Sequence, residues 1–145
     1  MDIEAIRRYC LTFPHATENI QWGADLCFKV DGKLFAVAAM EPGSVRLCFK
    51  CTSESFAEFC ERPGIRPAPY MARAQWVALE QFNTLPDSEL REAIAESYRL
   101  VWERLPKRRR LELQNQHRDP KPVETRVRVK SVKTAAKSKR AKAGK

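Results

Sequence analysis

The chain has 145 residues, of which 43% are hydrophobic and 31% are charged, and its formal net charge is +9. This length fits one domain with one hydrophobic core and excludes a large multidomain protein. No apolar run approaches membrane-spanning length, and the acidic, amphipathic N-terminus argues against a secretory leader. The five cysteines are an odd number, which favours reduced thiols over a disulfide framework. We therefore expect a cytoplasmic protein that does not bind membranes.

Positive charge is concentrated at the C-terminal end of the chain. Residues 107–145 contain fifteen Lys and Arg against three Asp and Glu, a net charge of +12, whereas residues 1–106 carry −3. Every Phe, Tyr and Trp precedes Lys107, so the C-terminal segment cannot bury enough apolar surface to offset its chain entropy. We expect a folded domain over residues 1–106 and a basic tail over residues 107–145 that is disordered when free. Within the tail, Lys107 to Leu111 can either extend the last helix past Pro106 or start the linker.

The first half of the domain combines one helix with three strands. Apolar residues at helical spacing predict a helix from Ile3 to Phe13, ended by Pro14, and a loop through His15 and Thr17 follows. Three β-rich runs come next, over residues 25–30, 33–40 and 45–51. An Asp-Gly pair between the first two runs suits a tight hairpin turn, and a Pro-Gly pair before the third suits a type II turn.

The second half of the domain is mainly helical. A helix is predicted over residues 53–61, and a Pro-rich segment over residues 62–69 is expected to be irregular. A short strand follows over residues 75–79. The last helix begins at Asp87, its predicted N-cap, and presents one apolar face as far as Leu105.

This order of elements predicts an α+β fold, a two-layer sandwich of an antiparallel β-meander sheet with helices on one face. Hairpin-connected strands give an antiparallel sheet, and helices before and after the meander cover one face and leave the other open. Strand alternation places a set of apolar residues on the covered face: Leu26, Phe28, Val30, Val45, Leu47, Phe49 and Cys51. The open face then carries three cations, Lys29, Arg46 and Lys50, with Lys33 at the hairpin tip.

Motifs for catalysis or metal binding have little support. Cys48 and Cys51 have the C-x-x-C spacing of zinc and redox sites. An odd separation within a strand directs the two thiols to opposite faces, and no second pair or nearby His completes a metal set. The only histidines are His15 and His117, and no phosphate-loop, dinucleotide or metalloprotease motif occurs. We predict no cofactor, no metal and no enzyme activity.

The segment 62–76 combines prolines with three Arg, a Tyr and a Trp. Proline lowers the entropy of such a loop, so its side chains can be held ready for a ligand, and Arg with aromatics can bind phosphates and stack on bases. In the alternative, Tyr70 and Trp76 attach the loop to the core while the arginines pair with acids of the domain. The alternative is stronger for the aromatics than for Arg66 and Arg73.

A set of linked motifs extends over roughly residues 3–105. The motifs are Trp22 to Val30, Gly32 to Val37, Phe56 to Phe59, Arg62 to Ile65, Pro67 to Tyr70, Ala72-Arg73 and Trp76-Val77. Together they resemble the MmcQ/YjbR family of small bacterial proteins. The resemblance implies a compact CyaY-like (frataxin-like) α+β domain, a proposed DNA-binding surface and no established catalytic residues. Iron delivery is not expected, since the first helix offers only Asp2 and Glu4 as acids.

These observations predict a non-enzymatic, monomeric protein that binds nucleic acid, DNA rather than RNA, through a tail that attracts phosphates without regard to sequence. The predicted contacts in the domain are Lys29, Lys33, Arg46, Lys50, Arg66 and Arg73. Those in the tail are Lys107, Arg108, Arg109, Arg110, Lys137, Lys139, Arg140 and Lys142. The alternative is a protein or small-ligand interaction module that uses the segment Arg62 to Trp76. A third option is an enzyme whose site is not visible from residue types.

Overall fold

The computed structural model describes residues 1–69 and 71–118. The chain divides at Pro106 into two compact units, Met1–Pro106 and Lys107–Lys145. Among the described residues, the first unit forms a six-stranded sheet with strand order β1-β2-β3-β4-β6-β5, in which all neighbours are antiparallel. The predicted α+β class with an antiparallel sheet is therefore confirmed.

The elements of the first unit follow the predicted order, with two additional strands. Its helices are α1 (Ile3–Cys10), α2 (Ser53–Cys60) and α3 (Asp87–Arg104), with a short 3-10 helix, η1 (Ala72–Ala74). Its strands are β1 (Ala16–Gln21), β2 (Asp25–Val30), β3 (Lys33–Ala39), β4 (Leu47–Lys50), β5 (Ile65–Pro67) and β6 (Trp76–Leu79). None of the described helices is long and apolar enough to cross a bilayer.

Both additional strands lie at edges of the sheet. The loop predicted through Thr17 is wrong, because β1 pairs with β2 along its whole length, from Ala16 opposite Val30 to Gln21 opposite Asp25. The prediction of an irregular Pro-rich segment is also wrong, because β5 pairs with β6. Edge strands bury little and tolerate proline, since one side of their backbone needs no partner. Their sequences therefore lack the apolar alternation by which strands are predicted.

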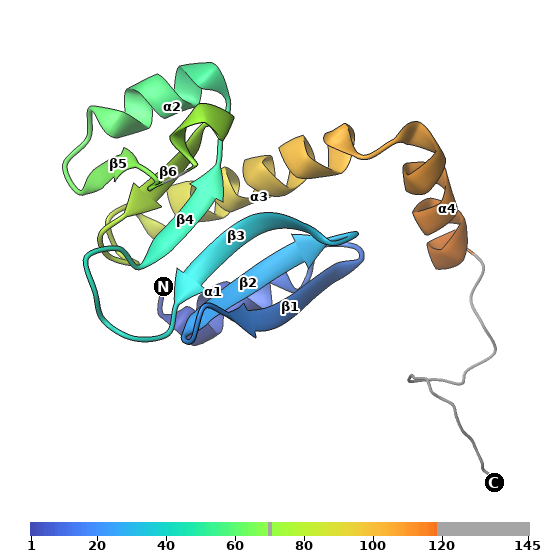
Figure 1. Cartoon of the computed structure of the whole chain (residues 1–145), viewed down its shortest axis with the longest axis horizontal. Helices are drawn as coiled ribbons and strands as arrows, with labels where there is room; N and C mark the ends of the chain where they lie inside the picture. Colours follow the sequence, from blue (N-terminus) through green and yellow to red (C-terminus); the bar gives the residue numbers. More distant parts are fainter. Residues whose placement is uncertain (70, 119–145) are drawn as a thin grey trace, which may run out of the picture. The chain divides into compact units, whose positions relative to one another are not determined.

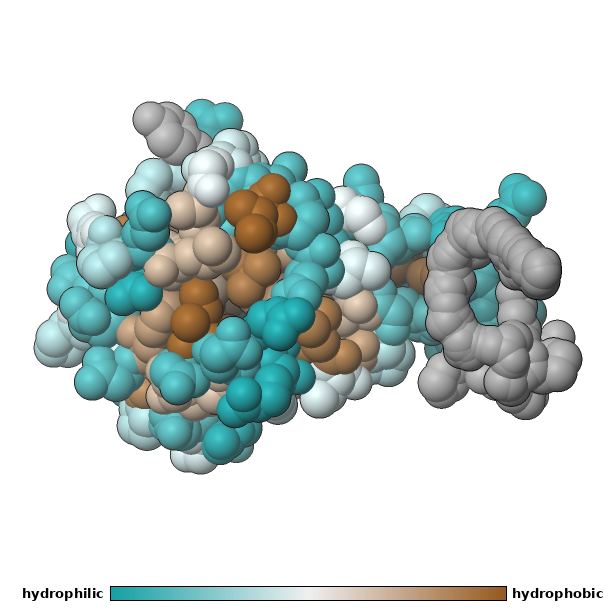
Figure 2. All heavy atoms as spheres, turned by 90° about the horizontal axis from the view of Figure 1, so that it is seen from below, coloured by the Kyte–Doolittle hydropathy of each residue, from teal (hydrophilic) through white to brown (hydrophobic). Residues whose placement is uncertain are grey.

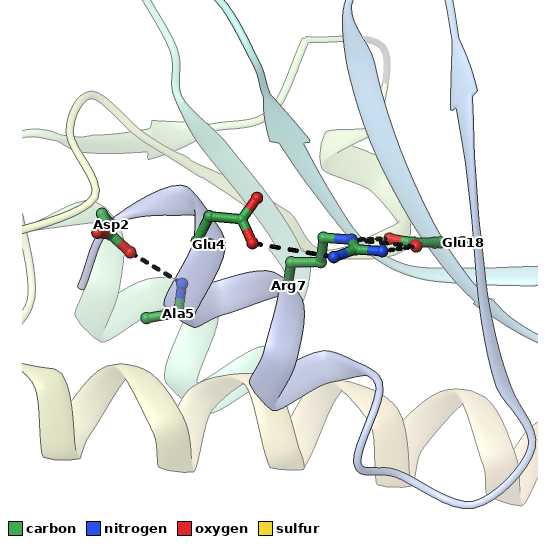
Figure 3. A network of polar contacts seen from close by, with 5 residues as sticks. All are labelled: Asp2, Glu4, Ala5, Arg7 and Glu18. Carbon is green, nitrogen blue, oxygen red and sulfur yellow. Dashed lines mark hydrogen bonds and ion pairs between the residues drawn. The ribbon is translucent and has the colours of Figure 1, made fainter.

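The ends of the helices follow from capping. The Asp2 carboxylate accepts a hydrogen bond from the Ala5 N–H at 2.8 Å and caps α1 (Figure 3). At α3 the predicted cap is wrong: Pro86 is the N-cap residue, and Asp87 is the first residue of the helix. The Asp87 carboxylate instead accepts a hydrogen bond from the N-terminal ammonium of Met1 at 2.7 Å, which lowers the pKa of that carboxyl.

Helices α1 and α3 cover one face of the sheet, behind the strands as seen in Figure 1. The apolar side chains that fill this layer are fully buried, among them Phe28, Phe35, Leu47 and Phe49. Between β2 and β3, Asp31 and Gly32 have φ values of 49° and 77°, the two positive values that a type I′ hairpin turn requires. The predicted hairpin and the helix-covered core are thus both present.

The opposite face of the sheet is not fully open, which corrects the prediction. Ala68, Trp76 and Ala78 are at most 5% exposed and form a second, smaller core there. Partly buried side chains pack against it: Leu34, Val37, Val45, Cys48 and Met71. Val45 was expected on the helix-covered face, but β4 begins only at Leu47, so strand alternation does not extend back to it.

The second unit contains helix α4 (Lys107–Arg118). The prediction of disorder from residue 107 is therefore wrong for these twelve residues. Leu105 has an extended ψ of 147° that ends α3, and Pro106 is compatible with the start of a new helix. Arg, Leu, Glu and Gln are good helix formers, and Glu112 pairs with Arg108 and Arg109 at helical spacing. The rest of the predicted tail lies outside the described residues.

Candidate nucleic-acid interface

The cations predicted on the sheet are Lys29, Lys33, Arg46 and Lys50, and the structure places them in different settings. Lys33 is the exposed first residue of β3, directly after the hairpin turn. Lys29 lies on β2, where a β-bulge shifts the register between Phe28 and Lys29. Both side chains reach solvent at least in part, so both are available to a phosphate.

Arg46 is held by the protein itself. Its guanidinium carbon lies 4.4 Å from the centre of the Phe82 ring, within the range of a cation–π contact. One terminal nitrogen donates to the Ala39 carbonyl at 3.3 Å, and the buried Nε has no hydrogen-bond partner among the described residues. Arg46 therefore holds the loop before β4 in place, and only part of its guanidinium remains for a ligand.

Lys50 is also engaged, because its Nζ donates to the Ala74 carbonyl at 2.6 Å. Partial burial lowers the pKa of the Lys50 ammonium, and the neighbouring Arg104 lowers it further. Arg104 is exposed near the end of α3 and was not among the predicted contacts. The position of Arg104 beside a sheet cation depends on tertiary packing, which the sequence does not reveal.

The sheet cations form two groups rather than one patch. Lys29 on β2 lies opposite Leu34 on β3. Lys50 on β4 comes directly after Phe49, the last residue of β4 that pairs with β3. The two lysines therefore lie near the same end of the sheet, on strands that flank β3. Strands β2 and β4 are two strand spacings apart, so the backbones of the two lysines are separated by about 10 Å. Arg46 and Arg66 lie at the other end, where Arg66 pairs with Glu80 at 2.9 Å and donates to the Ser44 carbonyl.

The loop of residues 62–76 is fastened to the domain by its own side chains. Arg62 forms a two-bond contact with Glu89, Arg66 pairs with Glu80, and Trp76 is 5% exposed. Arg73, on η1, is exposed. Most of these side chains, which could otherwise contact a ligand, therefore form contacts within the domain instead.

A row of nearly parallel aromatic rings was missed by sequence reasoning. The Phe13 and Tyr98 rings lie 4.7 Å apart at 13°, Tyr98 and Trp102 lie 6.3 Å apart at 14°, and Trp102 and His15 lie 6.1 Å apart at 7°. All four residues are partly exposed. The two inner rings, Tyr98 and Trp102, have a ring against each face, so a nucleobase could stack only at an end of the row. The one sequence signal is the i, i+4 spacing of Tyr98 and Trp102 on α3.

In the second unit, Lys107, Arg108, Arg109 and Arg110 occupy the first turn of α4, which contains no acidic residue. Glu112 partly neutralises them, at 2.7 Å from Arg109 and 3.5 Å from Arg108, whose side chain is 89% exposed. The positive end of the helix dipole adds to this charge. Lys137, Lys139, Arg140 and Lys142 lie outside the described residues.

The two cysteines of the C-x-x-C motif have separate surroundings. Cys48 packs with the Trp76 cluster, whereas the Cys51 Sγ lies 3.4 Å from the Gln75 carbonyl oxygen. Burial raises the pKa of each thiol to about 11. Neither thiol is therefore prepared as a nucleophile at neutral pH.

The described structure defines a small α+β domain with a partly neutralised cationic sheet, followed by a basic helix. A family model described as YjbR matches residues 11–100. "Uncharacterized protein YjbR" from Escherichia coli K12 is 27% identical over 114 residues, which cover 76% of this chain and 95% of the relative, and the O157:H7 relative gives the same values. The chain belongs to the YjbR family, which confirms the resemblance seen in the sequence.

Two solved structures share this fold. The crystal structure of Deinococcus radiodurans protein DR2400 matches with a TM-score of 0.70 and 27% identity, over 77% of this chain and 87% of that one. A protein from Pseudomonas syringae matches with a TM-score of 0.59 and 19% identity, over 70% of this chain and 99% of that one. The second likeness concerns the fold alone.

Proposed function

We infer that this protein is a non-enzymatic nucleic-acid-binding protein, with DNA as the first ligand to test. The observation that carries this inference is the separation of charge along the chain, +12 over residues 107–145 against −3 over residues 1–106. A polyphosphate attracts such a segment by releasing condensed counterions, whatever its base sequence. The CyaY-like arrangement implied by the family resemblance, and the cytoplasmic location predicted from the N-terminus and the cysteines, are retained as expectations.

In this proposal the C-terminal unit supplies most of the affinity, and the domain supplies weaker contacts. The first turn of α4 holds four consecutive cations, and Glu112 pairs with two of them, Arg108 and Arg109. The domain offers Lys29, Lys33 and Arg104 as partly or fully exposed cations, and the end of the aromatic row at His15 as a stacking surface. The alternative of a ligand-binding loop over residues 62–76 has less support, because most of its arginines and Trp76 are engaged within the domain.

The test is a titration of fluorescently labelled duplex DNA with the full chain at several salt concentrations. If about six cations meet phosphates, log K should fall with log salt at a slope of roughly −5. Replacement of Lys107, Arg108, Arg109 and Arg110 by Gln should flatten this slope by about 2–4. The matched control replaces two exposed cations of the domain, Arg8→Gln and Arg91→Gln, and should leave the slope nearly unchanged.

A second comparison separates the two units. A chain that ends at Pro106 should lose most of the affinity for duplex DNA at moderate salt. Equal affinities of the full and shortened chains would refute the inference that the C-terminal unit dominates. Single-stranded DNA and RNA of the same length serve as parallel ligands. A preference for a single strand that is lost with His15→Ala would assign base stacking to the end of the aromatic row.

A further inference from the structure

A groove lies between α1 and the β1–β2 hairpin. Its volume is about 630 Å³, and its walls come from Ile3, Glu4, Arg7, Glu18, Asn19, Ile20, Leu26 and Met40. Ile20 is 57% exposed and Met40 is 42% exposed. Figure 2 views the molecule from this side and shows hydrophobic side chains that gather between hydrophilic ones. The groove therefore has an apolar part that no described residue covers.

The other part of the groove is charged. The Arg7 guanidinium forms two hydrogen bonds through Nε and one through Nη2 to the Glu18 carboxylate, at 2.6–3.0 Å, and lies 3.8 Å from Glu4 (Figure 3). One guanidinium thus faces two carboxylates. The Glu4 side chain is 63% exposed, so its charge is only weakly compensated. A cation entering the groove would pair with Glu4.

Strand β1 forms one wall of the groove and one edge of the sheet. Among the described residues it pairs only with β2, so alternate N–H and C=O groups point outward without a strand partner. Many proteins protect such an edge with Lys, Pro or a bulge, but the sequence from Ala16 to Gln21 contains no Lys or Pro, and its register with β2 is regular. The edge can accept another strand.

We propose that this groove and the β1 edge bind an extended segment of a partner protein, in which an aliphatic side chain and a Lys or Arg lie two residues apart. Glu18 and Ile20 are two residues apart on the groove side of β1, a separation of about 7 Å, and an added strand has the same repeat. Such a strand places its aliphatic side chain beside Ile20 and its cation on the same face, toward Glu4. The backbone edge provides affinity, and the two side chains provide specificity.

Charge complementarity favours a basic extended segment over a globular partner or a second copy of this chain. The two carboxylates around Arg7 favour a basic segment, and the groove volume suits two or three side chains rather than a globular surface. A second copy paired edge to edge through β1 is the competing occupant, and self-association of the free chain would reveal it. The positive C-terminal unit repels a basic peptide, so binding of such a peptide to the full chain reports on the groove.

The experiment measures the fluorescence anisotropy of a labelled ten-residue peptide with a central Val-Thr-Arg sequence, titrated with the full chain. A peptide with Gln in place of Arg is the reference, because an acidic peptide would bind the basic unit. We expect the Arg peptide to bind about tenfold more tightly than the Gln peptide. Glu4→Gln should remove this preference, while Ile20→Ala should weaken both peptides about tenfold.

Matched controls are Glu54→Gln, an exposed acid in the first turn of α2, and Leu111→Ala, a 49% exposed apolar residue of α4. Both should leave peptide binding unchanged. Hydrogen exchange of the outward amides between Ala16 and Gln21 should slow when peptide is bound. The proposal would be overturned if neither Ile20→Ala nor Glu4→Gln changed the affinity for the peptides. So would self-association of the free chain that Ile20→Ala abolishes, because the edge would then belong to a second copy.

Discussion

The single buried polar side chain among the described residues, Ser97, gives the sharpest test of the fold. Its hydroxyl donates to the Phe35 carbonyl at 2.6 Å and accepts from the Lys50 N–H at 2.9 Å. Pairing between β3 and β4 runs only from Ala38 to Ala36, so these two backbone groups lie just beyond the last pair. The Ser97 hydroxyl on α3 therefore bridges the two backbone groups where the next hydrogen bond between β3 and β4 would otherwise form.

Ser97→Ala should therefore destabilise the protein by about 2–5 kcal/mol, because it leaves a buried carbonyl and a partly buried N–H unpaired at about 1–3 kcal/mol each, slightly offset by the helix propensity of Ala. Ser88→Ala, the same change at an exposed position of α3, should stay within about 0.5 kcal/mol of the parent. Urea unfolding measures both free energies, and hydrogen exchange should show faster opening at the Lys50 amide. Equal unfolding midpoints for the two variants would refute the bridging role.

The remaining predictions concern the core and the thiols. Phe28→Ala, at a fully buried ring, should cost about 3–5 kcal/mol in urea unfolding, whereas Lys29→Ala next to it should cost at most about 0.5 kcal/mol; similar costs would contradict the assignment of the two faces. Burial raises the pKa of Cys10 to about 12 and the pKa values of Cys48 and Cys51 to about 11. In the unfolded chain a thiol has a pKa of about 8.5. Above about pH 8.5 the thiols therefore ionise more readily in the unfolded chain, and the free energy of unfolding falls until the pH reaches the folded pKa values. The urea concentration at the unfolding midpoint should decrease as the pH is raised above about 9. A midpoint that stays constant up to about pH 11 would contradict the burial of these thiols. Metal analysis of the purified protein should find no stoichiometric zinc, and zinc that disappears with Cys48→Ser would show that the separation of the two thiols is wrong.

Much of the secondary structure could be predicted from local patterns. The helix that begins after Asp2, the Asp31-Gly32 turn and the apolar alternation through Phe28 and Phe49 each depend on neighbours in the chain. The capping hydrogen bond, the left-handed turn and the period of two are local effects. These features therefore correspond closely to the observed elements.

The candidate sites were less predictable, because they depend on pairs of residues far apart in the sequence. Lys50 was expected as a free surface cation, but Ala74 binds its ammonium across 24 positions. Arg66 was expected to be available, but Glu80, directly after the end of β6, pairs with it. Residue types indicate which side chains can bind an anion, but not which acid within the same chain reaches them first.

Composition and local periodicity are enough to predict the α+β class, the order of most elements and the separation of charge between the two units. The folded arrangement was needed to see that Ala16–Gln21 forms an edge strand, that loop residues bury part of the second sheet face, and that Arg7 and Glu18 meet beside an apolar groove. An edge strand or a surface groove is shaped by contacts between distant segments. Such contacts leave no period in the chain that a reader of the sequence could detect.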